Sequence, residues 1–380
     1  MSARFEYAGP AEWLAPRSLV GLPVPVFHAQ ALGAVSDGGA DGWVVTLGAE
    51  MLFDRNGLAL LADALAKAPA SVGRATFALV PDESARREYY SLQPGGGARV
   101  ELPVTATRAG AGGETQLTVD LPVRAFPIPF PASMYGETTV SVPRALLLPA
   151  RSPFDVLFAN QIALLGEIER RAGASPLAFL RALARPRSAP TFPQRMGLAF
   201  RDVSREAFVH PTAVIEGSVI EAGARVGAHA CVRWSVIRAG ARLHDGAKVE
   251  QSVVGRNSWL MHDLVLYRSV AEEDVFLIHG PYQFSLFQRA SAAFATILMD
   301  YRPDGKPIQV ETPMGLAPYQ GMFLGAVYGE RSKTLGGSST APGRVIPPDV
   351  WLGQDPAAIH LLQQRELELR RVLPPAATRK

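Results

Sequence analysis

The sequence of 380 residues has a single cysteine, Cys231, which excludes an intrachain disulfide framework and a zinc site built from several thiolates. It has no run of about 18 apolar residues, and its first residues lack the charged start and apolar core of a signal peptide. The excess of positive charge is also small, since the formal net charge is only +3 and the Lys and Arg residues are dispersed without a long basic run. We therefore expect a cytoplasmic protein with neither a membrane nor a nucleic acid as its partner.

A chain of 380 residues is long enough for two or three domains, and a hydrophobic fraction of 48% allows each of them its own core. Over residues 1–183 the pattern predicts an α/β domain with a mostly parallel sheet. A buried strand at 41–48, a helix at 56–68 and a second strand at 74–80 form its first unit. The Gly and Pro clusters between 93 and 130 favour surface hairpins.

An amphipathic helix is predicted from about 154 to 171, after a Ser-Pro start. Three prolines among small and basic residues then follow at 185–197, and they cannot continue a helix. We therefore predict a linker over 184–207.

A repeat follows the linker. Aliphatic residues recur in steps of six, six and five, which gives a period of 17 residues, and small residues recur in the fifth place of each step. Such a period predicts a β-solenoid over 208–355, because stacked coils bury a core that no single coil can bury. The aliphatic positions are Ile220, Val226, Val232, Ile237, Leu243, Val249, Val254, Leu260, Leu266, Ala271 and Leu277.

The period also aligns polar residues of successive coils. One predicted ladder contains Ser218, Ser235, Ser252 and Ser269, and a second contains Glu216, Arg233, Glu250 and Tyr267. Alternating charge in the second ladder favours the correct stacking, since neighbouring strands lie about 4.8 Å apart.

The repeat is interrupted after Tyr282. We predict an insertion over 283–320, either a helix with a hairpin or two strands, before hexads return at 323–353. The segment 356–380 is expected to be an amphipathic helix and a tail that cap the last coil or contact another subunit.

These hexads resemble the left-handed parallel β-helix of hexapeptide-repeat proteins. Their 6-6-5 pattern is similar to the C-terminal domains of sugar-nucleotide pyrophosphorylases, as is "FLGAVYGERSKTLGGSSTAPGRVIPP" at 323–348. The stretches "LVGLPVPVFHAQALGA" (19–34) and "DGWVVTLGAEMLFD" (41–54) resemble a reduced sugar-phosphate nucleotidyltransferase domain. The resemblance implies a homo-oligomer, either a trimer or a dimer.

The N-terminal domain departs from that family where it would hold phosphates. The family has a Gly-rich loop and a nearby lysine, whereas "YAGPAEWLAPRSLV" at 7–20 has neither. Glu50 and Asp54 stand where the family binds Mg²⁺, and they are candidate metal ligands if they are not simply structural. We expect a domain that binds a nucleotide or a sugar without cleaving it. The alternative is an active sugar-1-phosphate nucleotidyltransferase.

Hexapeptide acyltransferases, which these hexads resemble, use a histidine as general base while acyl-CoA lies along the β-helix. Here Asp245, His262 and His279 are spaced by 17 residues and are predicted to stack. An imidazole oriented by a neighbour suits a general base, because its pKa lies near operating pH. The same column has the ligand types of a transition-metal site, and it also fits a polar ladder exposed to solvent.

Two further groups are candidates for cofactor binding. Trp234 and Arg268 belong to another 17-spaced column, which can stack a planar group and bind a phosphate or only cover the surface. Arg331 and Lys333 can meet the phosphates of acyl-CoA or a nucleotide. His244 is interpreted as a surface residue.

Two hypotheses remain for the function. The first is acyl transfer at the β-helix onto a sugar or sugar-nucleotide substrate, with His262 or His279 as the base. The second is a non-catalytic scaffold or sugar-nucleotide sensor.

Overall fold

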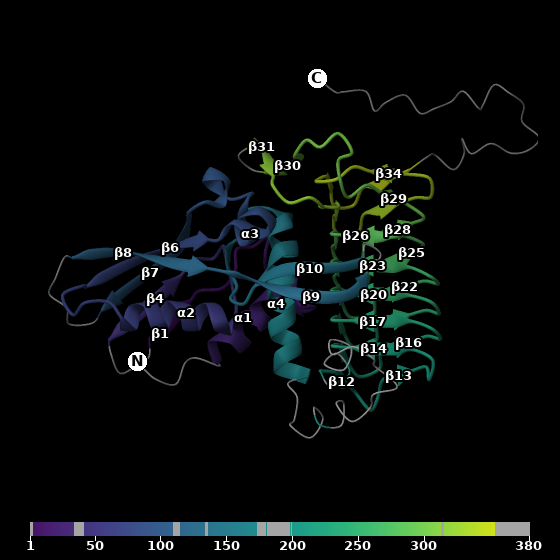
Figure 1. The fold of residues 1–380 in the computed structure, drawn as a ribbon, viewed down its shortest axis with the longest axis horizontal. Coiled ribbons are helices and arrows are strands. Elements are labelled where there is room, and N and C mark those ends of the chain that lie inside the picture. The colour runs from purple at the N-terminus through teal and green to yellow at the C-terminus, as the bar shows by residue number, and fades with distance from the viewer. Residues whose placement is uncertain are drawn as a thin grey trace, which may run out of the picture.

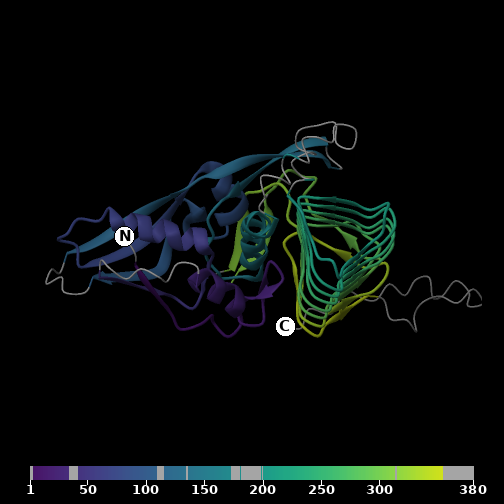
Figure 2. The same cartoon turned by 90° about the horizontal axis from the view of Figure 1, so that it is seen from below.

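The computed structural model describes residues 3–33, 42–108, 115–133, 136–172, 180, 198, 200–312 and 315–353. It contains an α/β domain and a three-sided parallel β-helix, which lie side by side with helix α4 (Pro153–Ala172) between them (Figures 1 and 2). The predicted two-domain architecture is confirmed.

The N-terminal sheet is mixed rather than mostly parallel. Its five strands lie in the order β1, β4, β7, β6, β8. The pairs β1–β4 and β6–β8 are parallel, but β7 runs antiparallel to both of its neighbours. The bounds are β1 (Arg4–Tyr7), β4 (Trp43–Leu47), β6 (Arg74–Pro81), β7 (Val100–Arg108) and β8 (Gln116–Val123).

Strand β7 corrects the prediction of surface hairpins between 93 and 130. It is the central strand, and its alternate side chains, including Val104 and Ala106, are buried. Pro103 argues against a strand in the sequence, but the pairing of β7 with β6 is irregular next to it, where a missing N–H is tolerated.

The helices around this sheet follow the predictions closely. Helix α2 (Arg55–Ala66) and α4 match the predicted helices at 56–68 and 154–171.

The remaining elements of the N-terminal domain are β2 (Ser18–Leu19), β3 (Leu22–Pro23), α1 (Val24–Gly33), β5 (Met51–Phe53), α3 (Glu83–Ala85), the π-helical turn η1 (Arg86–Tyr90), the 3-10 turn η2 (Pro94–Gly97), β9 (Ala125–Ser133), β10 (Gly136–Pro143) and β11 (Leu147–Pro149).

The β-helix is built from short parallel strands in three sheets, which agrees with the predicted left-handed hexapeptide fold. The sheet that meets the N-terminal domain, here called the docking sheet, contains β12 (Asp202–Val203), β15 (Val219–Ile220), β18 (Val236–Ile237), β21 (Val253–Val254), β24 (Val270–Ala271), β27 (Leu286–Phe287), β32 (Val327–Tyr328) and β35 (Val345–Ile346). The outer sheet contains β13 (Phe208–Val209), β16 (Arg225–Val226), β19 (Arg242–Leu243), β22 (Trp259–Leu260), β25 (Phe276–Ile278), β28 (Ala292–Phe294), β33 (Lys333–Thr334) and β36 (Trp351–Leu352). The third sheet contains β14 (Val214–Glu216), β17 (Cys231–Arg233), β20 (Lys248–Glu250), β23 (Val265–Tyr267) and β26 (Tyr282–Gln283).

Both predicted ladders are present. Each serine of the first ladder accepts the backbone N–H of the next serine, as Ser235 Oγ does from Ser252 at 3.1 Å. In the second ladder the guanidinium of Arg233 bonds Glu216 at 3.0 Å and Glu250 at 3.1 Å. The predicted aliphatic positions and the small residues Ala224, Ala230, Ala241, Ala247 and Ser258 are buried in the interior.

The coils continue beyond the predicted start of the insertion. Strand β27 pairs with β24, and β28 pairs with β25, so residues 283–298 belong to the β-helix. The chain leaves the coil only after β29 (Ile297–Leu298), which pairs with β34 (Ser339–Thr340). The excursion contains an antiparallel hairpin of β30 (Ile308–Thr312) and β31 (Gly315–Tyr319). The predicted segment 356–380 and most of the linker lie outside the described residues.

The two domains share a buried interface. Outward side chains of the docking sheet, such as Val236 and Val253, belong to the same apolar core as the N-terminal domain. Ion pairs cross it: Arg17 bonds Glu272 at 3.0 Å and Glu330 at 2.9 Å. Burial raises the pKa of Glu272 to about 7, against the attraction of Arg17.

Candidate functional site

Five of the seven histidines follow strands of the outer sheet, at the corner where the chain turns into the third sheet. They are His210, His229, His244, His262 and His279. This corner, here called the histidine edge, is opposite the docking sheet and therefore lies on the side of the β-helix away from the N-terminal domain (Figure 1).

His244 and His262 form a pair on this edge. Their ring centroids are 4.9 Å apart and the rings meet edge to face. The ring of His244 is half-buried, with the indole of Trp259 at 6.3 Å, and His262 is exposed. Burial, and then the nearby charge of His262, lower the pKa of His244. The pair thus offers imidazoles, one of them held toward its neutral form, at a site that solvent and substrates can reach.

Asp245 does not orient the predicted base. Its Oδ1 accepts the backbone N–H of Ala228, in the preceding coil, at 2.7 Å. Gly227 allows this approach, because a side chain there would collide with the carboxylate. The predicted role of Asp245 as the partner of His262 is replaced by a structural one, which fixes the corner between two coils.

His279 departs from the predicted column. In its coil the two inward residues Leu277 and Tyr282 are only five positions apart, and both are buried in the core. In the preceding coil the matching residues Leu260 and Leu266 are six positions apart. His279 therefore takes the left-handed backbone (φ 57°) that Asp263 (φ 54°) has there. The ring that contacts His262 is that of His244 instead. The prediction that 17-residue spacing stacks all three side chains is therefore wrong at its last step.

The outer sheet beside the histidine edge carries a ladder of cations and aromatic rings. The guanidinium of Arg242 lies 4.4 Å from the ring of Trp259, whose other neighbour is Phe276 at 6.3 Å. Further along the same sheet, Lys333 Nζ lies 4.4 Å from the ring of Trp351. Cations held over aromatic faces are suited to planar, anionic ligands.

Arg331 is less available than Lys333. Its guanidinium bonds both oxygens of Asp349, at 2.7 and 2.8 Å, and Glu330 at 2.6 Å. Of the two predicted phosphate-binding residues, only Lys333 keeps its charge free of a carboxylate among the described residues.

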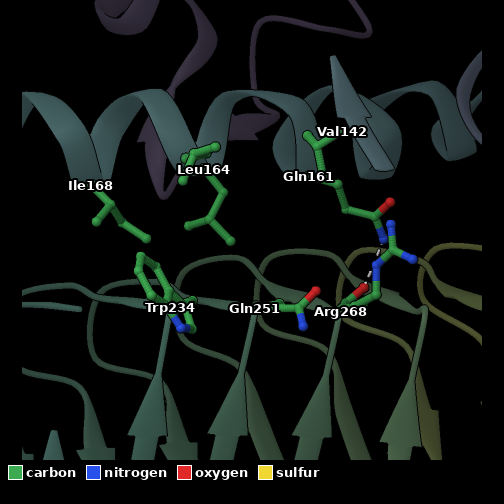
Figure 3. Close-up of a pocket in the computed structure, with 8 residues that line it drawn as sticks. Val142, Gln161, Leu164, Ile168, Trp234, Gln251 and Arg268 are labelled. Carbon is green, nitrogen blue, oxygen red and sulfur yellow. Dashed lines mark hydrogen bonds between the residues drawn. The ribbon is translucent and has the colours of Figure 1, made fainter. Parts of the chain in front are cut away.

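The predicted column of Trp234 and Arg268 lies in the domain interface. Both residues face α4, next to Leu164 and Ile168, around a cavity of about 30 Å³ that has room for little more than a water molecule (Figure 3). Arg268 is buried, and its guanidinium bonds the hydroxyl of Tyr89 at 2.8 Å and Glu88 at 3.3 Å. This column joins the domains, and its prediction as a cofactor site is wrong.

The predicted Mg²⁺ ligands do not form a cation site. Asp54 is the N-cap of α2, where its Oδ1 accepts the N–H groups of Gly57 at 2.7 Å and Leu146 at 3.0 Å. Burial raises the pKa of Asp54 to about 6, so its charge is disfavoured. Glu50 is exposed at a turn. Across the described parts of the chain, no group of three His, Cys, Asp or Glu side chains is arranged to hold a metal ion.

Two further findings concern exposure. Cys231 is half-buried, and burial raises the pKa of its thiol, which keeps it in the unreactive protonated form. Within the described ranges, no helix has both the length and the apolar character needed to span a bilayer.

The sequence interpretation missed His244. It lies 18 residues before His262, so a search for 17-residue columns passes over it. His244 is the first residue after its strand and His262 is the second after its own. A search that also compared neighbouring positions of successive corners would have found the pair.

Comparisons with known proteins give only distant likenesses. No protein-family model matches the chain, and no curated protein matches it. Among solved structures, a proposed acetyltransferase of Bacillus cereus is 17% identical, with 40% of this chain and 73% of that chain covered and a TM-score of 0.19. PerB from Caulobacter crescentus, in complex with CoA and GDP-perosamine, is 12% identical, with 51% and 85% covered and a TM-score of 0.16. Neither likeness extends to the chemistry of a site, and the resemblance of the N-terminal domain to nucleotidyltransferases stays a prediction.

Proposed function

We propose that this protein is an acyltransferase whose reaction takes place at the histidine edge, with His262 as the general base. The observation that carries the proposal is the contact between His244 and His262, with ring centroids 4.9 Å apart at an exposed corner. A neutral imidazole is needed to accept a proton, and the lowered pKa of His244 keeps a second positive charge away from His262.

The proposed step transfers the acyl group from a thioester to a hydroxyl or an amine. His262 takes the proton of the acceptor as its oxygen or nitrogen attacks the thioester carbonyl carbon. The new C–O or C–N bond forms, the C–S bond breaks, and the imidazolium returns the proton to the thiolate that leaves. The reaction needs no metal ion in this scheme.

Acyl-CoA is the proposed donor, bound along the outer sheet. Arg242 and Lys333 present cations on that sheet for its phosphates, and Trp259 presents an aromatic ring beside the two histidines. His279, one coil further on, remains a proposed alternative base.

The acceptor is proposed to be a sugar or sugar nucleotide, which the N-terminal domain binds without cleaving. Within one chain the histidine edge faces away from that domain. The proposal therefore requires the predicted homo-oligomer, in which a second copy of the chain brings its acceptor site to this edge.

The test is an acylation assay with acetyl-CoA and a panel of amino and hydroxy sugars, free and nucleotide-linked, with products identified by mass. We expect the wild type to form an acetylated product and His262→Ala to lose it, while Asp245→Asn keeps most of the activity. If the wild type consumes no acyl donor with any acceptor, acyl transfer is wrong and the non-catalytic scaffold is the better interpretation.

A further inference from the structure

A second pocket opens where the N-terminal domain meets the excursion of the β-helix. Its volume is about 850 Å³, within the range of small-molecule sites. One wall comes from α3 and η1, and the other comes from residues 301, 302 and 305–308 and from 319–323, at the end of β31. The pocket shares no residue with the histidine edge.

Hydrogen bonds between the two domains hold the pocket walls together. The hydroxyl of Tyr319 donates to the carbonyl of Glu88 at 3.2 Å, and the N–H of Gln320 donates to Ser91 Oγ at 3.2 Å. The backbone of the excursion is thereby fixed against η1, so the pocket is formed before any ligand binds.

Positive charge exceeds negative charge around this pocket. Four cations line it, Arg86, Arg87, Arg302 and Lys306, against one carboxylate, Glu83. Asp304, outside the lining, bonds Arg302.

Two of these cations are available to a ligand. In the part of the chain that the structure describes, neither Arg86 nor Lys306 forms a salt bridge, and the carboxylate nearest to Lys306 is that of Asp304, which accepts its backbone N–H at 3.2 Å and attracts its charge. Arg87 donates only weakly, to the carbonyl of Gln320 at 3.4 Å. The four cations and the two carboxylates Glu83 and Asp304 together leave an excess of two positive charges. This excess matches a pyrophosphate diester, which carries one negative charge on each phosphate.

Aromatic side chains line the same pocket. The ring of Tyr301 is 51% exposed and meets Phe323 edge to face, with centroids 6.5 Å apart. Phe323 in turn stacks on Phe284 of the β-helix at 5.5 Å, which steadies the group. An exposed ring beside unpaired cations can stack a nucleobase while the cations bind its phosphates.

We infer that this pocket binds a nucleoside diphosphate group, with Arg86 and Lys306 on the phosphates and Tyr301 against the base. Two molecules contain this chemistry: the ADP part of CoA and the nucleoside diphosphate of a sugar nucleotide. The site is tested by binding alone, so its failure would leave the acyl-transfer proposal untouched, and the failure of acyl transfer would leave this site untouched.

The experiment is calorimetric titration of the full-length protein with ADP, adenosine, inorganic pyrophosphate, CoA and UDP-glucose. We expect saturable ADP binding that weakens as salt rises and that exceeds the binding of adenosine and of pyrophosphate. If CoA binds more tightly than UDP-glucose and the R86M and K306M double variant weakens that CoA binding, the pocket is an acyl-donor site. If UDP-glucose binds more tightly and is weakened in the same way, the pocket is a sugar-nucleotide site.

Variants locate the binding. The double substitution R86M and K306M should weaken ADP binding at least tenfold, on the order of the loss of a charge-assisted hydrogen bond. Tyr301→Ala should weaken it about fivefold or more. Arg74→Met, an exposed arginine on β6, is the matched control and should leave binding unchanged. Circular dichroism of each variant verifies its fold.

Two results would overturn the inference. One is the absence of saturable ADP binding by the wild type, and the other is an affinity for ADP in the R86M and K306M double variant that equals that of the wild type. Pyrophosphate binding as tight as ADP, unchanged in Tyr301→Ala, would refute the nucleoside part and leave a simple anion site.

Discussion

Replacing Arg238 by methionine perturbs the domain interface at its most buried cation. The side chain is 1% exposed and lies between the β-helix and the N-terminal domain. Its Nε donates to the carbonyl of Val20 at 2.6 Å. Its two terminal nitrogens bond Glu221 at 2.5 Å and Glu167 at 3.2 Å. Methionine keeps an apolar stem of similar shape but removes every one of these donors.

The contacts that remain set the size of the effect. The carbonyl of Val20 loses the guanidinium as a partner, which costs about 1–3 kcal/mol for a buried group. The two carboxylates keep one cation each, since Arg170 bonds Glu167 and Arg171 bonds Glu221. We therefore expect Arg238→Met to lower the free energy of unfolding by about 3 kcal/mol, at the low end for breaking a buried ion pair.

The assay is urea unfolding followed by circular dichroism, with Arg233→Met as the matched control. Arg233 also bridges two glutamates of successive coils, but its side chain is 27% exposed and lies in the third sheet. Its loss should cost only about 1 kcal/mol, because solvent reaches Arg233 and partly screens these half-buried pairs. Equal losses for the two variants, or a loss below about 1 kcal/mol for Arg238→Met, would refute the reasoning that buried ion pairs hold the domains together.

Three further predictions concern the β-helix and the N-terminal domain. Burial raises the pKa of Glu272 to about 7, so its native state binds a proton that the unfolded state releases, and stability should fall as pH rises from about 5 to 8. Urea unfolding across this range should show a shallower fall for Glu272→Gln, and an identical slope would contradict the assignment. Asp54→Ala should lower the free energy of unfolding by about 1–2 kcal/mol through loss of the α2 cap. Mg²⁺ should leave the wild-type melting temperature unchanged, whereas a rise that Asp54→Ala abolishes would restore the metal interpretation. Gly255→Ala should cost about 3 kcal/mol, because a Cβ there would collide with the backbone of Glu272 in the next coil. A melting temperature within a degree or two of the wild type would show that the coils can separate at that corner.

The β-helix could be predicted because its signals are local. An inward position such as Val249 is set by the spacing along one coil, and the same spacing places Arg233 between Glu216 and Glu250. The period therefore predicts both the architecture and the ladders.

Outward positions could not be assigned in this way. Whether Arg268 faces solvent or Glu88 depends on which sheet the N-terminal domain covers, and that contact joins residues 180 apart. The single-residue deletion before Tyr282 likewise moves His279 out of its column without disturbing the inward pattern. The second pocket brings Arg86 together with Lys306, and no repeat or motif in the sequence links them.

The central claim is that the protein transfers acyl groups at the histidine edge with His262 as the general base. The most direct measurement is the rate of free CoA thiol release from acetyl-CoA, with and without acceptor, in the wild type, His262→Ala and His210→Ala. His210 lies on the same edge but bonds Thr212 at 2.9 Å, so it is the matched control. The account predicts acceptor-dependent release that falls about 100-fold or more in His262→Ala and is preserved in His210→Ala. Equal rates in the wild type and His262→Ala, or no acceptor-dependent release in any of them, would contradict it.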